Sequence, residues 1–292
     1  FGLMIHTSKI SLPYSLPDTV QASITRSFGE DFCFDSKDIA QVCMIGAAQG
    51  PVEFALLGDS HSLSAVQSLS DYAAGIGRRG IYLGYSGCPP LLGVIPFRRD
   101  ENQTLCPESF AKFYDQIAAQ NISDVILIAR WSLYTGAQDS RTGAGLQFVG
   151  IQPQAPQTLE ANRAALAQGL AATTAFAKAH DIRLHIVQQV PQQPFDAKSL
   201  YYRAFRRSES GALLDAYSVS TSRYSLDTQP ADALFTDTPL NVIYHHVDRI
   251  FCGTDICPVG TTAQSYYFDD DHLSLSGARK LRPVWEQALL PQ

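Results

Sequence analysis

The sequence has no long apolar run and little charge of either sign. No stretch reaches the roughly 18 consecutive apolar residues that a membrane-spanning helix needs, so we expect no part of it to cross a bilayer. Charged residues make up 17% of the 292 positions and the formal net charge is −6. No basic patch of the kind that binds nucleic acid is evident, so no nucleic-acid partner is expected. The chain also lacks a secretory signal pattern and starts at Phe1, which we interpret as a segment of a longer protein.

Metal-binding cysteine motifs are absent too. None of the six cysteines has Cys-x-x-Cys spacing, and no histidine is interleaved with them at zinc-site spacing, so we expect no metal and no cofactor. The cysteines form three couples of near neighbours, and proximity favours the disulfides Cys33–Cys43, Cys88–Cys106 and Cys252–Cys257. Disulfides would place the domain in an oxidising compartment, here the periplasm or the cell surface. Other pairings, and reduced cysteines buried in a cytosolic protein, remain alternatives.

A serine lies at an abrupt transition from apolar to helical sequence. The largely apolar run 52–57 ends in Gly58-Asp59-Ser60-His61, and helix-like spacing follows from 64 to 76. A serine at such a turn has its hydroxyl lifted clear of the sheet, close to the unpaired N–H groups at the helix start. A nucleophile needs that exposure, and the N–H groups can stabilise an oxyanion. The alternative is that Ser60 serves only as a helix cap.

The base that such a serine needs lies near the other end of the chain. Asp269 precedes His272 by three positions, ahead of a final helix expected to start near Ser276. In a tight loop the carboxylate can turn back to the imidazole Nδ1 and leave Nε2 facing the serine, as in a Ser-His-Asp triad. Alternatively, His272 is an ordinary loop histidine, and the acidic run 269–271 is a solvated turn or a weak cation site.

Apolar strands alternate with helices over most of the chain. The strands are expected at 52–57, 80–85, 125–129 and 184–190, and less clearly at 241–245, with helices at 62–76, 107–120, 157–180 and 276–290. This alternation predicts a three-layer α/β/α sandwich with a central, mostly parallel sheet. Functional residues then lie at the carboxyl ends of the strands. The segment 195–237 departs from the alternation, and we favour a helical cover over an insertion that shapes a substrate cleft.

The two motifs together resemble the SGNH hydrolases of the GDSL-like superfamily. Gly58-Asp59-Ser60 matches the first block of that family, and Asp269-x-x-His272 matches the last. The Gly-x-Ser-x-Gly elbow of the α/β-hydrolases is absent, because position 62 is Ser. The resemblance implies a flavodoxin-like sandwich and a catalytic triad of Ser60, Asp269 and His272.

The same resemblance implies where the oxyanion donors lie. The Ser60 N–H is one, and a glycine after the second strand is another, for which Gly87 matches and Gly84 is an alternative. The family has an asparagine after the third strand, but Arg130 and Trp131 stand there in this chain. Both are candidate oxyanion or substrate contacts, and the alternative for Trp131 is packing at the sheet end.

Four blocks narrow the resemblance to SGNH domains fused behind membrane-bound acyltransferase-3 domains. The blocks are Gly-Asp-Ser-His at 58–61, Gly-Cys-Pro-Pro at 87–90, Ala-Arg-Trp-Ser at 129–132 and Asp-Asp-Asp-His-Leu-Ser at 269–274. This resemblance implies O-acylation, often O-acetylation, of bacterial surface polysaccharides such as lipopolysaccharide O-antigen.

The expected organisation follows from that resemblance. Residues 1–50 would be a linker extension packing on the core, and residues 51–292 the catalytic domain. The partners would be an acyl donor, a polysaccharide acceptor and a preceding membrane acyltransferase domain that tethers the chain in the periplasm. Two alternatives stay open, a secreted carbohydrate acetyl esterase and a non-catalytic carbohydrate-binding module.

Overall fold

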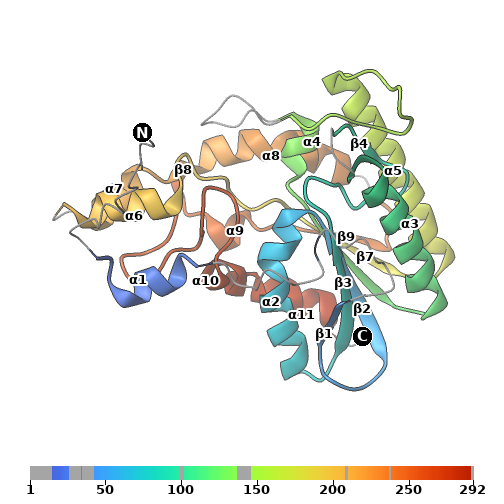
Figure 1. Ribbon diagram of the computed structural model, residues 1–292, viewed down its shortest axis with the longest axis horizontal. Coiled ribbons are helices and arrows are strands. Elements are labelled where there is room, and N and C mark those ends of the chain that lie inside the picture. The colour runs from blue at the N-terminus through green and yellow to red at the C-terminus, as the bar shows by residue number, and fades with distance from the viewer. Residues whose placement is uncertain are drawn as a thin grey trace, which may run out of the picture.

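A six-stranded sheet forms the centre of the computed structural model (Figure 1), which describes residues 15–25, 34, 43–98, 102–136, 146–207, 210–236 and 238–290. The strand order is β1-β3-β2-β5-β7-β9. The strands are β1 (Cys43–Gly46), β2 (Val52–Gly58), β3 (Arg79–Gly84), β5 (Asp124–Ile128), β7 (Arg183–Val187) and β9 (Val242–His245). Only β1 runs antiparallel to its neighbour, so the expected mostly parallel sheet is confirmed.

Helices cover both faces of this sheet, which explains why its central strands are apolar on both sides. On β2, Phe54 and Leu56 pack into one core with helices α2 (Ser60–Gly75) and α11 (Arg282–Leu289). Ala55 and Leu57 point the other way, into a core with α3 (Asn102–Ala119) and α5 (Leu159–Ala179). Successive side chains of a strand face opposite sides, so the run is buried throughout. The expected three-layer α/β/α sandwich is confirmed.

Two helices differ from their expected bounds, and proline is involved in both cases. Helix α3 begins at Asn102 and continues through Pro107. Proline has no backbone N–H, so the helix lacks one hydrogen bond at this residue. The expected last helix is instead divided into α10 (Leu275–Ala278), a 3-10 turn η1 (Arg279–Leu281) and α11. Pro283 lies in the first turn of α11, a position that proline favours because its N–H would be unpaired there anyway.

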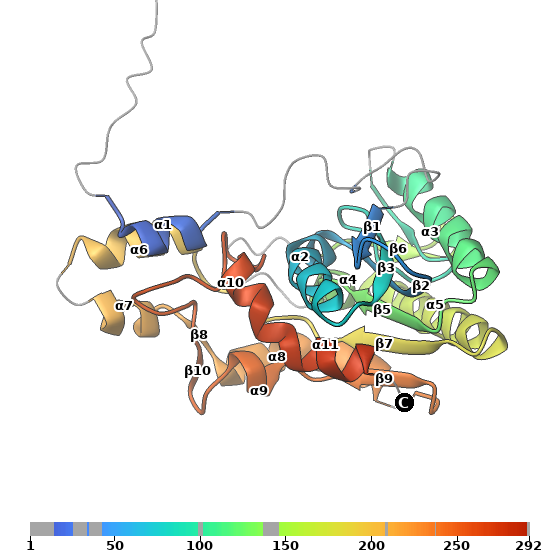
Figure 2. The ribbon, with the colours of Figure 1, turned by 90° about the horizontal axis from the view of Figure 1, so that it is seen from below.

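The segment that departs from the alternation forms three helices. Helix α8 (Thr221–Phe235) packs against the short helix α4 (Trp131–Thr135). Helices α6 (Ala197–Phe205) and α7 (Ser210–Ala216) instead lie beside α1 (Asp18–Ser23) in a small lobe at one side of the sheet (Figures 1 and 2). Within this lobe, the Tyr202 hydroxyl of α6 donates to Gln21 Oε1 of α1.

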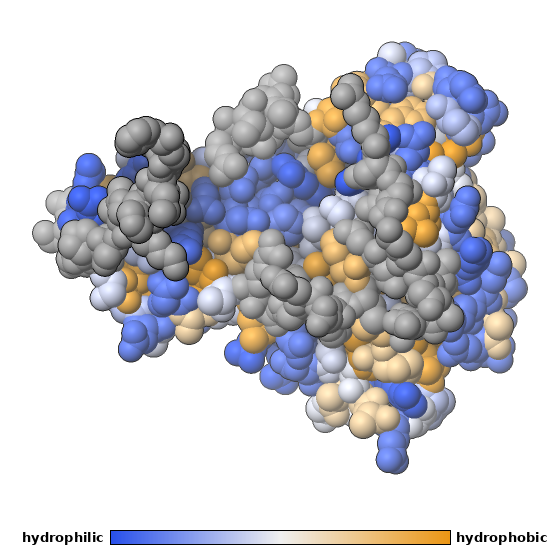
Figure 3. All heavy atoms as spheres, in the orientation of Figure 1, coloured by the Kyte–Doolittle hydropathy of each residue, from blue (hydrophilic) through white to orange (hydrophobic). Residues whose placement is uncertain are grey.

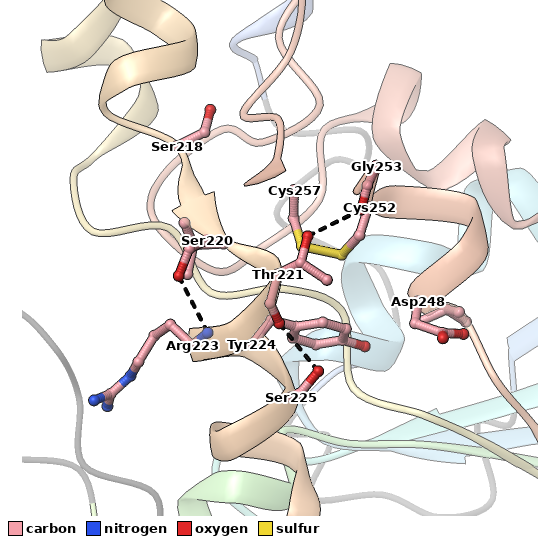
Figure 4. Close-up of a disulfide and its surroundings, with 12 residues drawn as sticks. Ser218, Ser220, Thr221, Arg223, Tyr224, Ser225, Asp248, Cys252, Gly253 and Cys257 are labelled. Carbon is pink, nitrogen blue, oxygen red and sulfur yellow. Dashed lines mark hydrogen bonds between the residues drawn. A yellow bond between two sulfur atoms is a disulfide. The ribbon is translucent and has the colours of Figure 1, made fainter. Parts of the chain in front are cut away.

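Two of the three expected disulfides are present. Cys88 is bonded to Cys106 and Cys252 to Cys257, whereas Cys33 of the third pair lies outside the described residues. The Cys252–Cys257 bridge closes a loop between α9 (Asp248–Phe251) and β10 (Ile256–Cys257), which pairs with β8 (Val219–Ser220). The Thr221 hydroxyl at the start of α8 donates to the carbonyl of Gly253 in this loop (Figure 4), and the distance between the two oxygens is 3.0 Å. A second small ribbon pairs β4 (Ile95–Pro96) with β6 (Val149–Gly150).

In the part of the chain that the structure describes, no helix is both long and apolar enough to span a membrane. The segment before β2 contributes directly to the core, because β1 pairs with β3 as an edge strand.

A fully buried carboxylate joins the elements at the amino-terminal edge of the sheet. Asp124 contacts Arg183 Nε at 2.7 Å and Arg78 Nη2 at 3.1 Å, and His185 Nε2 lies 3.4 Å away. Burial by itself would raise the pKa of Asp124, but its hydrogen bonds to His185, Arg183 and Ser123 hold the pKa well below its usual range. Asp124 is therefore a buried anion whose charge is matched from three directions.

We expect Asp124→Asn to lower the free energy of unfolding by about 3 kcal/mol or more, because removing one partner of a buried ion pair leaves the others uncompensated. Urea unfolding under non-reducing conditions, followed by circular dichroism, measures the loss. Glu286→Gln is the control, since it breaks only the exposed pair with Arg282 and should cost less than about 1 kcal/mol. Equal losses in the two variants would contradict a stabilising role for the Asp124 network.

Candidate active site

The turn that carries Ser60 consists of a single residue between β2 and α2. Gly58 ends the strand, and a side chain there would strike the Ile128 carbonyl oxygen, so only glycine fits. Asp59 has extended backbone and caps the helix, with its Oδ1 accepting the His61 N–H at 2.9 Å. Ser60 is therefore the first helical residue, half-buried at the carboxyl end of the strand.

The second carboxylate oxygen of Asp59 fixes this turn to the end of β5. Asp59 Oδ2 accepts the backbone N–H of Arg130 and the hydroxyl of Tyr134, both at 2.8 Å. Burial and the neighbouring Asp59 charge raise the pKa of Tyr134 well above its usual value. The phenol is thus kept protonated as a donor. Both carboxylate oxygens of the buried Asp59 therefore accept hydrogen bonds from the protein.

The loop before α10 supplies the histidine. Asp269 Oδ1 accepts the N–H groups of Asp271 and His272 at 3.0 and 2.8 Å, which turns the carboxylate back over its own loop. Its Oδ2 then lies 2.8 Å from His272 Nδ1. The ring of Phe268 stacks on the imidazole, with centroids 5.4 Å apart.

The structure brings the three residues of the expected triad together. His272 Nε2 lies 2.8 Å from Ser60 Oγ, across a sequence separation of 212 positions. In the neutral imidazole, Nδ1–H donates to the carboxylate and Nε2 accepts the serine proton, the tautomer a general base needs.

Contacts outside the site hold the helix of Ser60 and the segment after His272 together. The Ser68 hydroxyl of α2 donates to the Ala278 carbonyl at 2.9 Å, and the Trp285 indole N–H donates to Ser68 Oγ at 3.1 Å. The helix that begins at Ser60 is thereby tied to the segment that follows His272.

A glutamine links the histidine loop to the disulfide loop of Figure 4. The Gln193 N–H donates to the Asp270 carbonyl at 2.6 Å, and its side-chain amide donates to the Cys257 carbonyl at 3.2 Å. Gln193 Oε1 accepts the Val219 N–H at 3.1 Å. The Cys252–Cys257 loop therefore supports the backbone next to Asp269.

His272 contacts a second carboxylate that the sequence interpretation did not assign to the site. Asp271 Oδ1 lies 2.9 Å from His272 Nδ1. Burial by itself would lower the pKa of His272, but the hydrogen bonds to Asp269 and Asp271 outweigh it and raise the pKa to about 10. Burial would likewise raise the pKa of Asp271, yet His272 and the neighbouring His61 hold that pKa well below its usual range.

The two residues expected to supply oxyanion donors follow neighbouring strands of the sheet. Ser60 begins α2, and Gly87 follows β3, the strand that lies beside β2. Gly87 has a φ of +59°, and a side chain there would strike the Arg98 guanidinium. Among the contacts of the described residues, neither the Ser60 N–H nor the Gly87 N–H donates a hydrogen bond.

Trp131 lies in the core rather than at the site, which corrects the expectation that it is an oxyanion or substrate contact. Its indole N–H donates to the Val187 carbonyl at 2.9 Å, and its ring packs edge-on against Phe235 with centroids 4.9 Å apart. Only 1% of the residue is exposed. Neither its N–H nor its ring face is therefore open to an oxyanion or a sugar, and the packing alternative fits.

Arg130 faces the histidine loop through Asp271. Its Nη1 lies 2.8 Å from Asp271 Oδ2, and its Nη2 donates to Gln192 Oε1 at 2.9 Å. The sequence signal for Asp271 was its position directly before His272, but a run of three acids is equally typical of a solvated turn. Gln192 carried no signal, because it lies in irregular chain after β7.

The chain is similar in fold to the periplasmic domain of a lipopolysaccharide acetyltransferase from Salmonella ser. Paratyphi A. The two share 14% identity with a TM-score of 0.58, over 89% of this chain and 90% of that one. A putative acylhydrolase from Bacteroides fragilis shares 14% identity with a TM-score of 0.42, over 86% and 91% of the two chains. No curated protein matches the chain.

A family model describes the greater part of the sequence. The model of the SGNH domain, described as fused to AT3 domains, matches residues 27–287. This range includes Ser60 and Gly87 as well as the loop of Asp269 and His272. The chain therefore belongs to the family of SGNH domains that are fused to AT3 domains.

Proposed function

We propose that the chain is an O-acyltransferase domain that passes an acyl group, most simply acetyl, through Ser60 to a sugar hydroxyl of a cell-surface polysaccharide such as O-antigen. One observation carries the proposal, the 2.8 Å contact between Ser60 Oγ and a His272 whose Nδ1 is held by Asp269. A serine so placed can be activated by the imidazole. Membership of the SGNH family supports acyl chemistry at this serine.

The first half of the reaction loads the serine. His272 Nε2 takes the Ser60 proton as Oγ attacks the acyl carbonyl of the donor, and the N–H groups of Ser60 and Gly87 stabilise the oxyanion that forms. When the tetrahedral intermediate collapses, the bond between the carbonyl carbon and the donor's leaving group breaks. The leaving group takes the proton from His272, and an acyl-serine remains.

The second half transfers the acyl group. A sugar hydroxyl takes the place of the leaving group, His272 removes its proton, and the sugar oxygen attacks the acyl-serine carbonyl. Collapse of this intermediate breaks the bond to Ser60 Oγ, which regains its proton from His272. Water in place of the sugar would give hydrolysis by the same steps, so the acceptor and not the triad separates transferase from esterase.

The surroundings of the site are compatible with a hydrated acceptor. Figure 3 shows hydrophilic residues over α8, on the face that lies between the small lobe and the sheet. We place the domain in the periplasm, tethered through a preceding membrane acyltransferase domain. Residues 51–292 are the catalytic domain, and the extension 1–50 adds the edge strand β1 to its sheet. The two disulfides and the fusion described for the family support this placement.

We expect Ser60→Ala to lower kcat/KM for a small acetyl ester on the order of 10⁴-fold or more, because the nucleophile is lost. Ser62→Ala is the matched control, since the Ser62 hydroxyl donates to the Asp59 carbonyl and makes no contact with the imidazole. That variant should keep activity within a few fold. Initial rates with p-nitrophenyl acetate, normalised to folded protein, measure both. Wild-type activity in Ser60→Ala would exclude this serine as the nucleophile.

We expect an oligosaccharide acceptor to divert the acyl group from water, because both compete for the same acyl-serine. Mass spectrometry of the sugar, together with assay of the released acid, gives the partition between transfer and hydrolysis as the acceptor concentration rises. Ser60→Ala should form no acylated sugar. Hydrolysis alone at every acceptor concentration would point to an esterase. Polysaccharide binding without turnover in the wild type would point to a binding module.

A further inference from the structure

His272 is held by two carboxylates and not by one. Asp269 Oδ2 and Asp271 Oδ1 lie 2.8 and 2.9 Å from the same Nδ1 atom. The side chain of Asp271 is 7% exposed, against 27% for Asp269, so Asp271 is the more deeply buried of the two. A buried carboxylate is costly unless it is paired, and the second oxygen of Asp271 is paired as well.

That other oxygen is held by an arginine. Asp271 Oδ2 contacts Arg130 Nη1 at 2.8 Å, and His61 Nε2 lies 3.6 Å away. Arg130 is itself fixed, because its backbone N–H donates to Asp59 and its Nη2 to Gln192. The arginine thus connects the turn that carries the nucleophile with the loop that carries the base.

We propose that Asp271 is a second orienting carboxylate for His272, and that Arg130 is the positioning residue that holds Asp271 against the imidazole. The catalytic meaning of this arrangement rests on the proposed function, but its effect on the imidazole does not. It also assigns a task to the arginine that stands where the wider family has an asparagine. In this chain the position serves the base and not the oxyanion.

The charges around the imidazole support this assignment. The groups that face it are Asp269 and Asp271 from its own loop and His61 from α2, whose ring centroid lies 5.2 Å away. Arg130 acts from the end of β5 and reaches the imidazole only through Asp271. Two anions against one N–H stabilise the imidazolium that forms when Ser60 loses its proton.

The same two carboxylates affect how kcat/KM depends on pH. A general base must be neutral before it acts, and the pKa of His272 is raised to about 10. We therefore expect the free enzyme to hold mostly imidazolium at neutral pH. We expect kcat/KM for a small ester to rise with pH through the neutral range and to level off only near that pKa.

The test is the pKa of His272, followed by ¹⁵N NMR in the intact chain and assigned by loss of the signal in His272→Gln. The wild-type pKa should lie well above 8, and Asp271→Asn should lower it by about one to three pH units, because an adjacent anion is lost. Asp270→Asn is the control, since it removes the same charge from the same loop without removing a hydrogen bond to the imidazole. It should produce a clearly smaller shift.

Two outcomes overturn the assignment of Asp271. One is a wild-type pKa near the ordinary value of about 6.5, which needs no variant to fold. The other is an unchanged pKa in folded Asp271→Asn. Both are independent of turnover, so they remain distinguishable from a failure of the proposed function, which activity in Ser60→Ala would reveal.

A double-mutant cycle tests the role of Arg130. If Arg130 acts through Asp271, Arg130→Met should lower kcat about as much as Asp271→Asn does, and the double variant should lose little more than either one alone. Additive losses would overturn this role, because they would show that Arg130 acts on substrate or oxyanion by a separate route.

Discussion

The hydrogen bond between Ser60 and His272 is the contact on which the rest of the site depends. It joins residues 212 positions apart, so neither local segment can form it alone. Asp59 fixes the nucleophile end by capping α2 and binding the backbone of Arg130. The Ser68 contacts to the segment after His272 fix the other end. The geometry is thus set before any substrate binds, which is what positioning of a reacting pair requires.

Charged residues are few in this chain, and the two buried carboxylates near the site are both paired. The carboxylates of Asp59 and Asp271 are both buried, and each is met by a part of Arg130, the backbone N–H in one case and the guanidinium in the other. An unpaired anion in such a position would destabilise the fold by several kcal/mol. The electrostatics of the site and its mechanical rigidity therefore come from the same few contacts.

The candidate active site and the buried ionic network of Asp124 lie at opposite edges of the parallel sheet. Strands β2, β3 and β5 are parallel neighbours, so their carboxyl ends place Ser60, Gly87 and Arg130 along one edge. At the opposite edge Asp124 is matched by Arg78 and Arg183, and it has no contact with the triad. One edge can thus carry half-exposed polar groups for catalysis while the other provides a closed ionic network.

The alternation of apolar and helical segments determined the layered fold, and the local motifs around Ser60 and His272 determined the turn, the loop and the expected triad. Both follow from backbone periodicity and turn chemistry, which act over a few residues. Tertiary structure alone decided that β1 joins the sheet edge, that Trp131 turns into the core, and that Arg130 reaches Asp271. Each of these depends on which strands are neighbours and where their ends lie, because a side chain after a strand can point to the core or to the site with the same local sequence. The second carboxylate on His272 is likewise a property of the folded loop, since spacing alone does not separate a solvated acidic run from a buried one.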